Sequence, residues 1–248
     1  MPGFLAALQF LTIIPINTKG IREKDIVNSC IFFPLAGLFI GLILFIVYKP
    51  LASFLYVSPL LSSAIVVIFL AVITGGLHLD GLADTFDALS ANRDKAGKLE
   101  VMRDSRIGTM GVLSLTSVIA LKILLLSEID TFNKFSALLS MCILSRWAQV
   151  FCMRRFIYAR HSGKAKVFFS GMTKRIFLLA GFIALLAVVM LLRLNGIYLF
   201  VFVTIFAFLL GKLFSSRFGG LTGDIIGAIN EISEVLVLFI LIVLNRFI

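Results

Sequence analysis

The stretch "IFFPLAGLFIGLILFIVY", residues 31–48, is almost entirely apolar and contains no charged residue. A helix crosses the hydrocarbon core of a bilayer when about 20 consecutive residues are mainly apolar. The sequence therefore predicts an all-α, polytopic integral membrane protein with about seven transmembrane helices. The further apolar runs lie at about 59–78, 107–127, 135–153, 176–192, 197–214 and 232–248.

The composition and the N-terminus support this class. Of the 248 residues, 60% are hydrophobic, whereas a soluble domain of this size is roughly half apolar. A membrane β-barrel would need short alternating segments, which do not occur here. The stretch "MPGFLAALQFLTIIPI" has neither a basic leader nor a clear cleavage site, so it is not read as a removed signal peptide. Residues 3–16 are too short for a comfortable span, and we expect them to be interfacial or re-entrant.

The positive charge is distributed as in a membrane protein. The formal net charge is +10, from 23 Lys and Arg against 13 Asp and Glu. Seventeen of the basic residues lie in loops on the N-terminal side and four on the opposite side, so the positive-inside rule places the N-terminus in the cytoplasm. Membrane topology explains the excess of basic residues, so no nucleic-acid partner is expected. The N-terminal-side loops are 17–30, 80–106, 154–175 and 212–234.

An acidic cluster lies in the first of three polar motifs, "TGGLHLDGLADTFDAL", residues 74–89. If residues 77–90 are helical, Asp80, Asp84 and Asp87 lie on one helical face. Three carboxylates on one face repel one another unless a cation or a hydrogen-bond donor lies among them. The alternative is a solvated helix end after a transmembrane span.

Other residues of this motif could also take part in a binding or catalytic site. Gly81, together with Gly75 and Gly76, allows a backbone or a phosphate to approach closely. His78 could be a base or a ligand, although no metal-binding histidine spacing surrounds it.

The second motif is "KLEVMRDSRIGTMGVLSL", residues 98–115. Arg103 and Arg106 could clamp a phosphate, and Asp104 could ligate a metal or orient an arginine. Ser105 or Thr109 could cap the helix that follows, and a helix N-terminus is itself an anion site. The alternative is a positively charged flank with helix caps.

The third motif is "GGLTGDIIGAINEISE", residues 219–234. Asp224, Glu231 and Glu234 share one helical face, with Asn230 alongside. The glycines are best explained by close helix packing. Glu234 falls at or inside the last span, where ionisable groups are costly and usually face an interior site.

Basic residues elsewhere also suggest partners. Arg146 lies within a predicted span and needs a partner, for which one of the acidic residues is a candidate. The segment "RRFIYARHSGK", residues 154–164, could bind anionic substrate groups or could simply determine topology. The predicted topology places all three motifs on the same membrane face. Carboxylates from two helices with nearby arginines would suit Mg²⁺ and a pyrophosphate.

The three motifs closely resemble those of the cobalamin synthase family, the adenosylcobinamide-GDP ribazoletransferases. "LQFLTIIPI" and "FFPLAGLFIG" fit its N-terminal part, so the likeness covers essentially the whole chain. The resemblance implies a Mg²⁺-dependent enzyme of the bacterial inner membrane. It would join adenosylcobinamide-GDP to α-ribazole or α-ribazole 5′-phosphate, release GMP and complete the nucleotide loop of cobalamin.

The resemblance implies site residues in all three motifs, within a single transmembrane catalytic domain over 1–248. We expect the active site on the cytoplasmic face of the bilayer. The expected catalytic residues are Asp80, Asp84, Asp104 and Arg106. The expected substrate-binding residues are Arg103, Ser105, His78, Gly81 and Asn230. The expected metal ligands are Asp80, Asp84, Asp87, Asp224 and Glu231.

Two other functions are compatible with buried carboxylates in a membrane protein. A CDP-alcohol-type phosphotransferase carries a loosely similar acidic helix, but "DGLADTFD" lacks its arginine and its full spacing. An ion-coupled transporter would keep its charges near the bilayer midplane, often at broken helices, whereas these collect at one predicted face. A homo-oligomer is compatible with either class.

Overall fold

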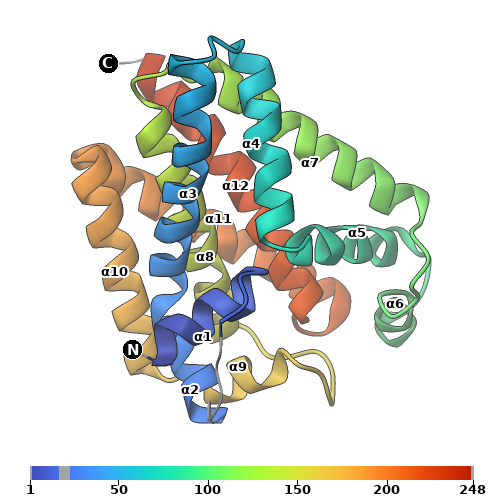
Figure 1. Ribbon diagram of the computed structural model, residues 1–248. Helices are drawn as coiled ribbons and strands as arrows, with labels where there is room; N and C mark the ends of the chain where they lie inside the picture. Colours follow the sequence, from blue (N-terminus) through green and yellow to red (C-terminus); the bar gives the residue numbers. More distant parts are fainter. Residues whose placement is uncertain (1, 17–22, 247–248) are drawn as a thin grey trace.

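The computed structural model describes residues 2–16 and 23–246, and the regular structure in these ranges is helical apart from one isolated β-bridge. Among these residues, six helices are each long and apolar enough to cross a membrane, which confirms the predicted all-α, polytopic architecture (Figure 1). They are α3 (Phe33–Ser53), α7 (Thr109–Glu128), α8 (Lys134–Arg155), α10 (Lys174–Leu192), α11 (Leu194–Phe218) and α12 (Gly223–Arg246).

The predicted span at 59–78 is not one continuous helix. It consists of α4 (Pro59–Ile73) and the start of α5 (Leu77–Ser90), and the two helix axes differ by 89°. Gly75 and Gly76 make the turn with φ values of 61° and 67°, a backbone region that glycine adopts without steric cost. The chain therefore turns sideways at the end of α4, and α5 runs across the bundle (Figure 1).

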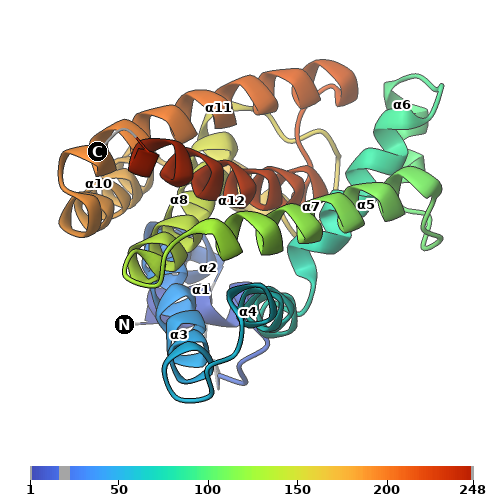
Figure 2. The same cartoon turned by 90° about the horizontal axis from the view of Figure 1, so that it is seen from above.

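Helix α8 forms the centre of the bundle. It packs against α3, α10, α11 and α12, and Figure 2 shows it among them from above. Its residues from Ala137 to Val150 are all buried. On one side Trp147 stacks on Phe200 of α11, with ring centroids 5.3 Å apart, and its Nε1 donates to Thr204 at 2.9 Å. A polar side chain on α8 therefore faces protein rather than lipid.

The third acidic motif is helical, so the predicted loop 212–234 is wrong. Helix α11 continues to Phe218, and α12 already begins at Gly223. Helix α12 packs against α5, α7 and α8. Its carboxylates can enter the bundle because cations from neighbouring helices meet them there. The predicted polar loop 80–106 likewise contains α5 and the short helix α6 (Lys95–Val101).

Helix α1 (Pro2–Leu11) and the end of α12 lie toward opposite ends of the molecule (Figure 1), as the seven predicted spans require. Helix α1 has 10 residues, or about 15 Å, which is too short to cross a bilayer. Beyond it, Ile13 N–H donates to the carbonyl of Ile73 at 2.8 Å, which ties this segment to the end of α4. The remaining short helices are α2 (Glu23–Asn28), η1 (Ser29–Phe32) and α9 (Lys166–Gly171).

Candidate functional site

The first and third acidic motifs meet where α5 crosses the start of α12. A Cβ atom on Gly81 would lie 2.6 Å from the carbonyl oxygen of Asp224, so only glycine permits this contact. Asp80 and Asp84 flank Gly81 on α5, and Asp224 lies in the first turn of α12. The contact thus brings together three of the predicted metal ligands, Asp80, Asp84 and Asp224. The close approach that was predicted at Gly81 is made by the backbone of Asp224.

Arg160 adds a positive charge to these carboxylates. Its Nη2 lies 3.0 Å from Oδ2 of Asp224, and the side chain is only 14% exposed. The segment before it is fixed to the start of α12, because Leu221 N–H donates to Ile157 O and Ala159 N–H donates to Leu221 O, both at 2.9 Å. In the sequence, Arg160 is one of several basic residues in a single segment, and nothing marks it out from them.

A cavity of about 280 Å³ opens beside this cluster. Its charged lining residues are Asp80, Asp224, Arg160 and Lys164. Its aromatic lining residues are Phe10, Phe33, Tyr158 and Phe168, and the buried polar residues His78 and Gln149 also line it. Burial raises the pKa of the Tyr158 hydroxyl. A cavity with both charged and aromatic surfaces can bind a ligand that combines phosphate with an aromatic group.

Asp87 has a structural task that the sequence did not reveal. Its two carboxylate oxygens accept hydrogen bonds from Gly108 N–H and Gly111 N–H, each at 2.7 Å. These groups lie at the start of α7, whose N-cap residue is Gly108. The expectation that Ser105 or Thr109 caps this helix is therefore wrong. The free N–H groups of α7 do bind an anion, and that anion is the Asp87 carboxylate of α5.

The second motif lies on an exposed loop. Arg103, Asp104, Ser105 and Arg106 are all exposed. Arg106 pairs with Asp104 at 2.7 Å, and its side chain is 87% exposed. Hydrogen bonds from the Arg106 side chain and backbone lower the pKa of Asp104 to about 2. Asp104 and Arg106 therefore pair with each other, and neither residue lines the cavity.

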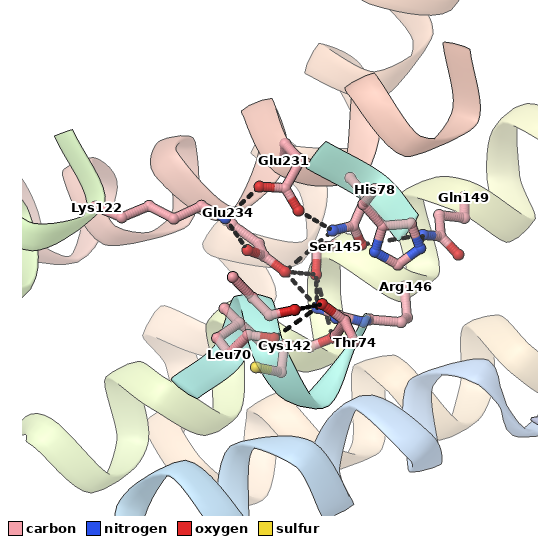
Figure 3. Close-up of polar contacts among 12 residues, drawn as sticks. Leu70, Thr74, His78, Lys122, Cys142, Ser145, Arg146, Gln149, Glu231 and Glu234 are labelled. Carbon is pink, nitrogen blue, oxygen red and sulfur yellow. Dashed lines mark hydrogen bonds and ion pairs between the residues drawn. The ribbon is translucent and has the colours of Figure 1, made fainter. Parts of the chain in front are cut away.

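Glu231 and Glu234 enter a buried ion network (Figure 3). Lys122 of α7 pairs with Glu231 at 2.6 Å and also with Glu234. Arg146 of α8 pairs with Glu234, which confirms that an acidic residue is its partner. The charges of the two cations and the two carboxylates cancel, as burial within a membrane requires. Glu231 lies seven residues after Asp224, or about 10 Å further along α12, so the structure does not bring it to Asp80 and Asp84.

His78 and Asn230 are linked to this network by Gln149. Nε2 of Gln149 donates to Oδ1 of Asn230 at 3.1 Å and lies 2.9 Å from Nε2 of His78. Asn230 in turn donates to Glu234 at 3.0 Å. Asn230 is fully buried and connects residues of the protein, whereas His78 reaches the cavity. Sequence reasoning missed Gln149, although a glutamine inside an apolar span was an available signal.

The carboxylates beside the cavity suit a magnesium ion by their chemistry. Among residues 2–16 and 23–246, no group of three or more His, Cys, Asp or Glu side chains is arranged to hold a metal ion. Mg²⁺, however, commonly uses one or two carboxylates and takes its other ligands from substrate phosphates and water. Asp80, Asp84 and Asp224 offer such hard oxygen donors beside a cavity that also contains Arg160.

Comparison with known proteins gives one consistent likeness. The family profile described as "Cobalamin-5-phosphate synthase" matches residues 3–242. A protein of Caldanaerobacter subterraneus subsp. tengcongensis is 37% identical over 243 residues, covering 95% of this chain and 96% of its own length. One from Escherichia coli is 36% identical, with 96% and 98% covered. Both are named adenosylcobinamide-GDP ribazoletransferase. The search of solved structures gave no match.

Proposed function

Because the chain belongs to the cobalamin-5-phosphate synthase family and is an adenosylcobinamide-GDP ribazoletransferase, we propose that it works with Mg²⁺ held by Asp80, Asp84 and Asp224. The observation that carries this proposal is the contact between Gly81 and Asp224. It brings carboxylates of two helices together beside a cavity whose lining also includes Arg160 and Lys164. The acceptor substrate is α-ribazole or its 5′-phosphate.

The reaction exchanges one phosphorus–oxygen bond for another. A ribose hydroxyl attacks the phosphorus nearer the corrinoid side chain and forms a new ester bond. The pyrophosphate bond breaks, GMP leaves with the bridging oxygen, and the hydroxyl proton passes to water or a carboxylate. Mg²⁺, when bound, would neutralise negative charge on the phosphates. Arg160 supplies a fixed positive charge beside the same carboxylates, where it can stabilise charge that develops on the leaving phosphate.

The test is replacement of single carboxylates by amides of the same shape. Asp84→Asn and Asp80→Asn should each lower turnover by about 10²-fold or more, because losing one electrostatic contact to the transition state costs roughly 3 kcal/mol. Turnover is measured as GMP release by the purified protein in detergent or liposomes, with a Mg²⁺ titration and an EDTA arm.

The matched control is Asp94→Asn. Asp94 is an exposed carboxylate that caps α6 by accepting from Gly97 N–H, and asparagine caps equally well. Its turnover should match that of the unaltered protein. If folded Asp80→Asn and Asp84→Asn proteins both turn over normally, the metal-binding role of this cluster is wrong.

The proposed location is the bacterial inner membrane, with the cavity facing the cytoplasm. The long apolar helices support a membrane protein. The charged residues of the cavity belong to the ends of α5 and α12 and to the segment between α8 and α9. The Lys and Arg distribution supports a cytoplasmic location for these parts of the chain.

A further inference from the structure

Three phenylalanines from three separate helices meet at the cavity. Phe10 of α1 lies 5.9 Å from Phe33 of α3 and 4.8 Å from Phe168 of α9, measured between ring centroids, and Phe33 and Phe168 are 6.0 Å apart. Phe33 and Phe168 are buried, whereas Phe10 is 40% exposed. The cavity therefore has an aromatic surface, to which a planar ring of a ligand can pack face to edge or by offset stacking.

The cavity also contains a buried hydrogen-bond donor without a partner. The amide nitrogen of Gln149 can only donate, so His78 Nε2, 2.9 Å away, accepts. An imidazole that accepts through Nε2 is neutral and carries its hydrogen on Nδ1. His78 is only 4% exposed, and its Nδ1 has no hydrogen-bond partner among the described residues. A buried donor left unpaired is destabilising, and a ligand with one acceptor atom would satisfy it.

The size of the cavity limits which chemical group of the two substrates can fit inside it. The cavity volume of about 280 Å³ is just below the range for small-molecule sites, which begins at about 300 Å³. A corrin macrocycle does not fit, whereas a bicyclic aromatic base does. Two such bases take part in the reaction, the benzimidazole of α-ribazole and the guanine of the GDP group.

Hydrogen-bonding capacity separates these two bases. The benzimidazole of α-ribazole has one ring nitrogen with a free lone pair and no N–H group, whereas guanine carries several donors and acceptors that need partners when buried. The neutral polar side chains of the cavity are few, and Gln149 is already engaged with Asn230 and His78. Among the described residues, Nε–H of Arg160 has no hydrogen-bond partner, but a guanidinium matches phosphate rather than a neutral base.

We propose that the cavity formed by α1, α3, α5, α8, α9 and α12 binds the benzimidazole base of the ribazole substrate, whose unsubstituted ring nitrogen accepts a hydrogen bond from His78 Nδ1–H. This proposal rests on the proposed function, because that function defines the substrates. It assigns the aromatic residues to the base and the Asp80, Asp224 and Arg160 cluster to the phosphates. It also makes His78 a residue that determines which bases are accepted.

The test measures binding without turnover. Calorimetric titration of α-ribazole into the purified full-length protein, without Mg²⁺ or adenosylcobinamide-GDP, gives a Kd that does not depend on catalysis. His78→Phe keeps a flat ring but removes the N–H donor, and it should weaken binding by about tenfold, within the range for a lost buried hydrogen bond. His78→Asn, whose amide can replace Nδ1–H, should bind α-ribazole more tightly than His78→Phe.

A ligand analogue keeps the test valid if a variant does not fold. The indole riboside, in which CH replaces the accepting nitrogen, should bind the unaltered protein about tenfold more weakly than α-ribazole. It should lose nothing further in His78→Phe. Equal affinity of the unaltered protein for both ribosides would overturn the proposal.

A GMP titration distinguishes the two bases. If His78→Phe weakens GMP binding and leaves α-ribazole binding unchanged, the cavity belongs to guanine and the proposal is wrong. Failure of the proposed function would appear separately, as GMP release that does not depend on Mg²⁺.

Discussion

Among single residues, Arg160 and Arg106 show how burial changes the task of a guanidinium. Arg160 is 14% exposed and contacts Asp224 beside the cavity. Arg106 is 87% exposed and pairs with Asp104 on a loop, where an ion pair contributes roughly 0–1 kcal/mol. The sequence analysis named Arg106 as a possible phosphate clamp and an expected catalytic residue, and that role stays a prediction. The contacts in the structure favour Arg160.

Lysine substitution separates these two arginines. Arg160→Lys should lower kcat/KM for adenosylcobinamide-GDP by about tenfold, because an ammonium cannot form the planar paired hydrogen bonds of a guanidinium. Arg106→Lys should remain within about threefold of the unaltered protein, as expected for an exposed pair. The measurement is initial GMP release at saturating α-ribazole. A large loss in Arg106→Lys with little change in Arg160→Lys would restore the original interpretation.

Several single residues could be interpreted from the sequence, and others could not. Arg146 needed an acidic partner on physical grounds alone, and Glu234 is that partner. Phe10, Phe33 and Phe168 could not be recognised, because a phenylalanine in an apolar run has no feature that distinguishes a ligand surface from lipid contact. Gln149 could have been noticed, since a lone amide within a span requires a polar neighbour.

Between elements, the junction of α5 with α7 depends on one carboxylate. Asp87 accepts from both Gly108 and Gly111, and a Cβ atom at either glycine would lie within 2.4 Å of that carboxylate. A negative charge at a helix N-terminus is also favourable. Asp87 therefore fixes the start of α7 to the helix that carries Asp80 and Asp84.

Substitution of Asp87 distinguishes a helix cap from a metal ligand. Asp87→Asn should lower the free energy of unfolding by about 1 kcal/mol, within the range for altered caps, and leave the Mg²⁺ concentration for half-maximal activity unchanged. Thermal unfolding in detergent and a Mg²⁺ titration measure the two effects. A tenfold rise in that Mg²⁺ concentration, without loss of stability, would show that Asp87 is a ligand.

The transmembrane elements were predictable to the extent that their apolar runs were uninterrupted. Helices α3, α7, α8, α10 and α11 match the predicted runs apart from their ends. The bend between α4 and α5 had a signal in Gly75 and Gly76, but a glycine pair does not reveal whether it serves a turn or a ligand. Helix α12 was predicted too short, because its polar first half is stabilised by cations on α7 and α8 that no local pattern reveals.

For the whole molecule, the orientation in the membrane follows from the charge distribution and the position of the ends. Helix α1 and the end of α12 lie toward opposite ends of the molecule (Figure 1), and the basic residues concentrate in the loops on the N-terminal side. In the proposed orientation, which follows the positive-inside rule, α6 and the cavity residue Lys164 lie in the cytoplasm and the loop between α7 and α8 lies on the other side.

Labelling of introduced cysteines tests this orientation. A membrane-impermeant thiol reagent added to intact cells should fail to label Lys95→Cys and should label Thr131→Cys, because both positions are exposed but lie on opposite sides. The natural cysteines are buried and should give little background signal. Efficient labelling at position 95 in sealed cells, with none at position 131, would reverse the assigned orientation.

The neutral network of Lys122, Arg146, Glu231 and Glu234 also has a consequence for biosynthesis. Lys122 precedes Glu234 by 112 residues and Arg146 precedes it by 88, so a ribosome makes both cations several seconds before their counterions, at about 5–20 residues per second. Until α12 is inserted, α7 and α8 each carry an uncompensated charge, which opposes their stable release into lipid. The last helix therefore completes the fold, and a nascent chain that stops before residue 231 should remain dependent on the insertion machinery.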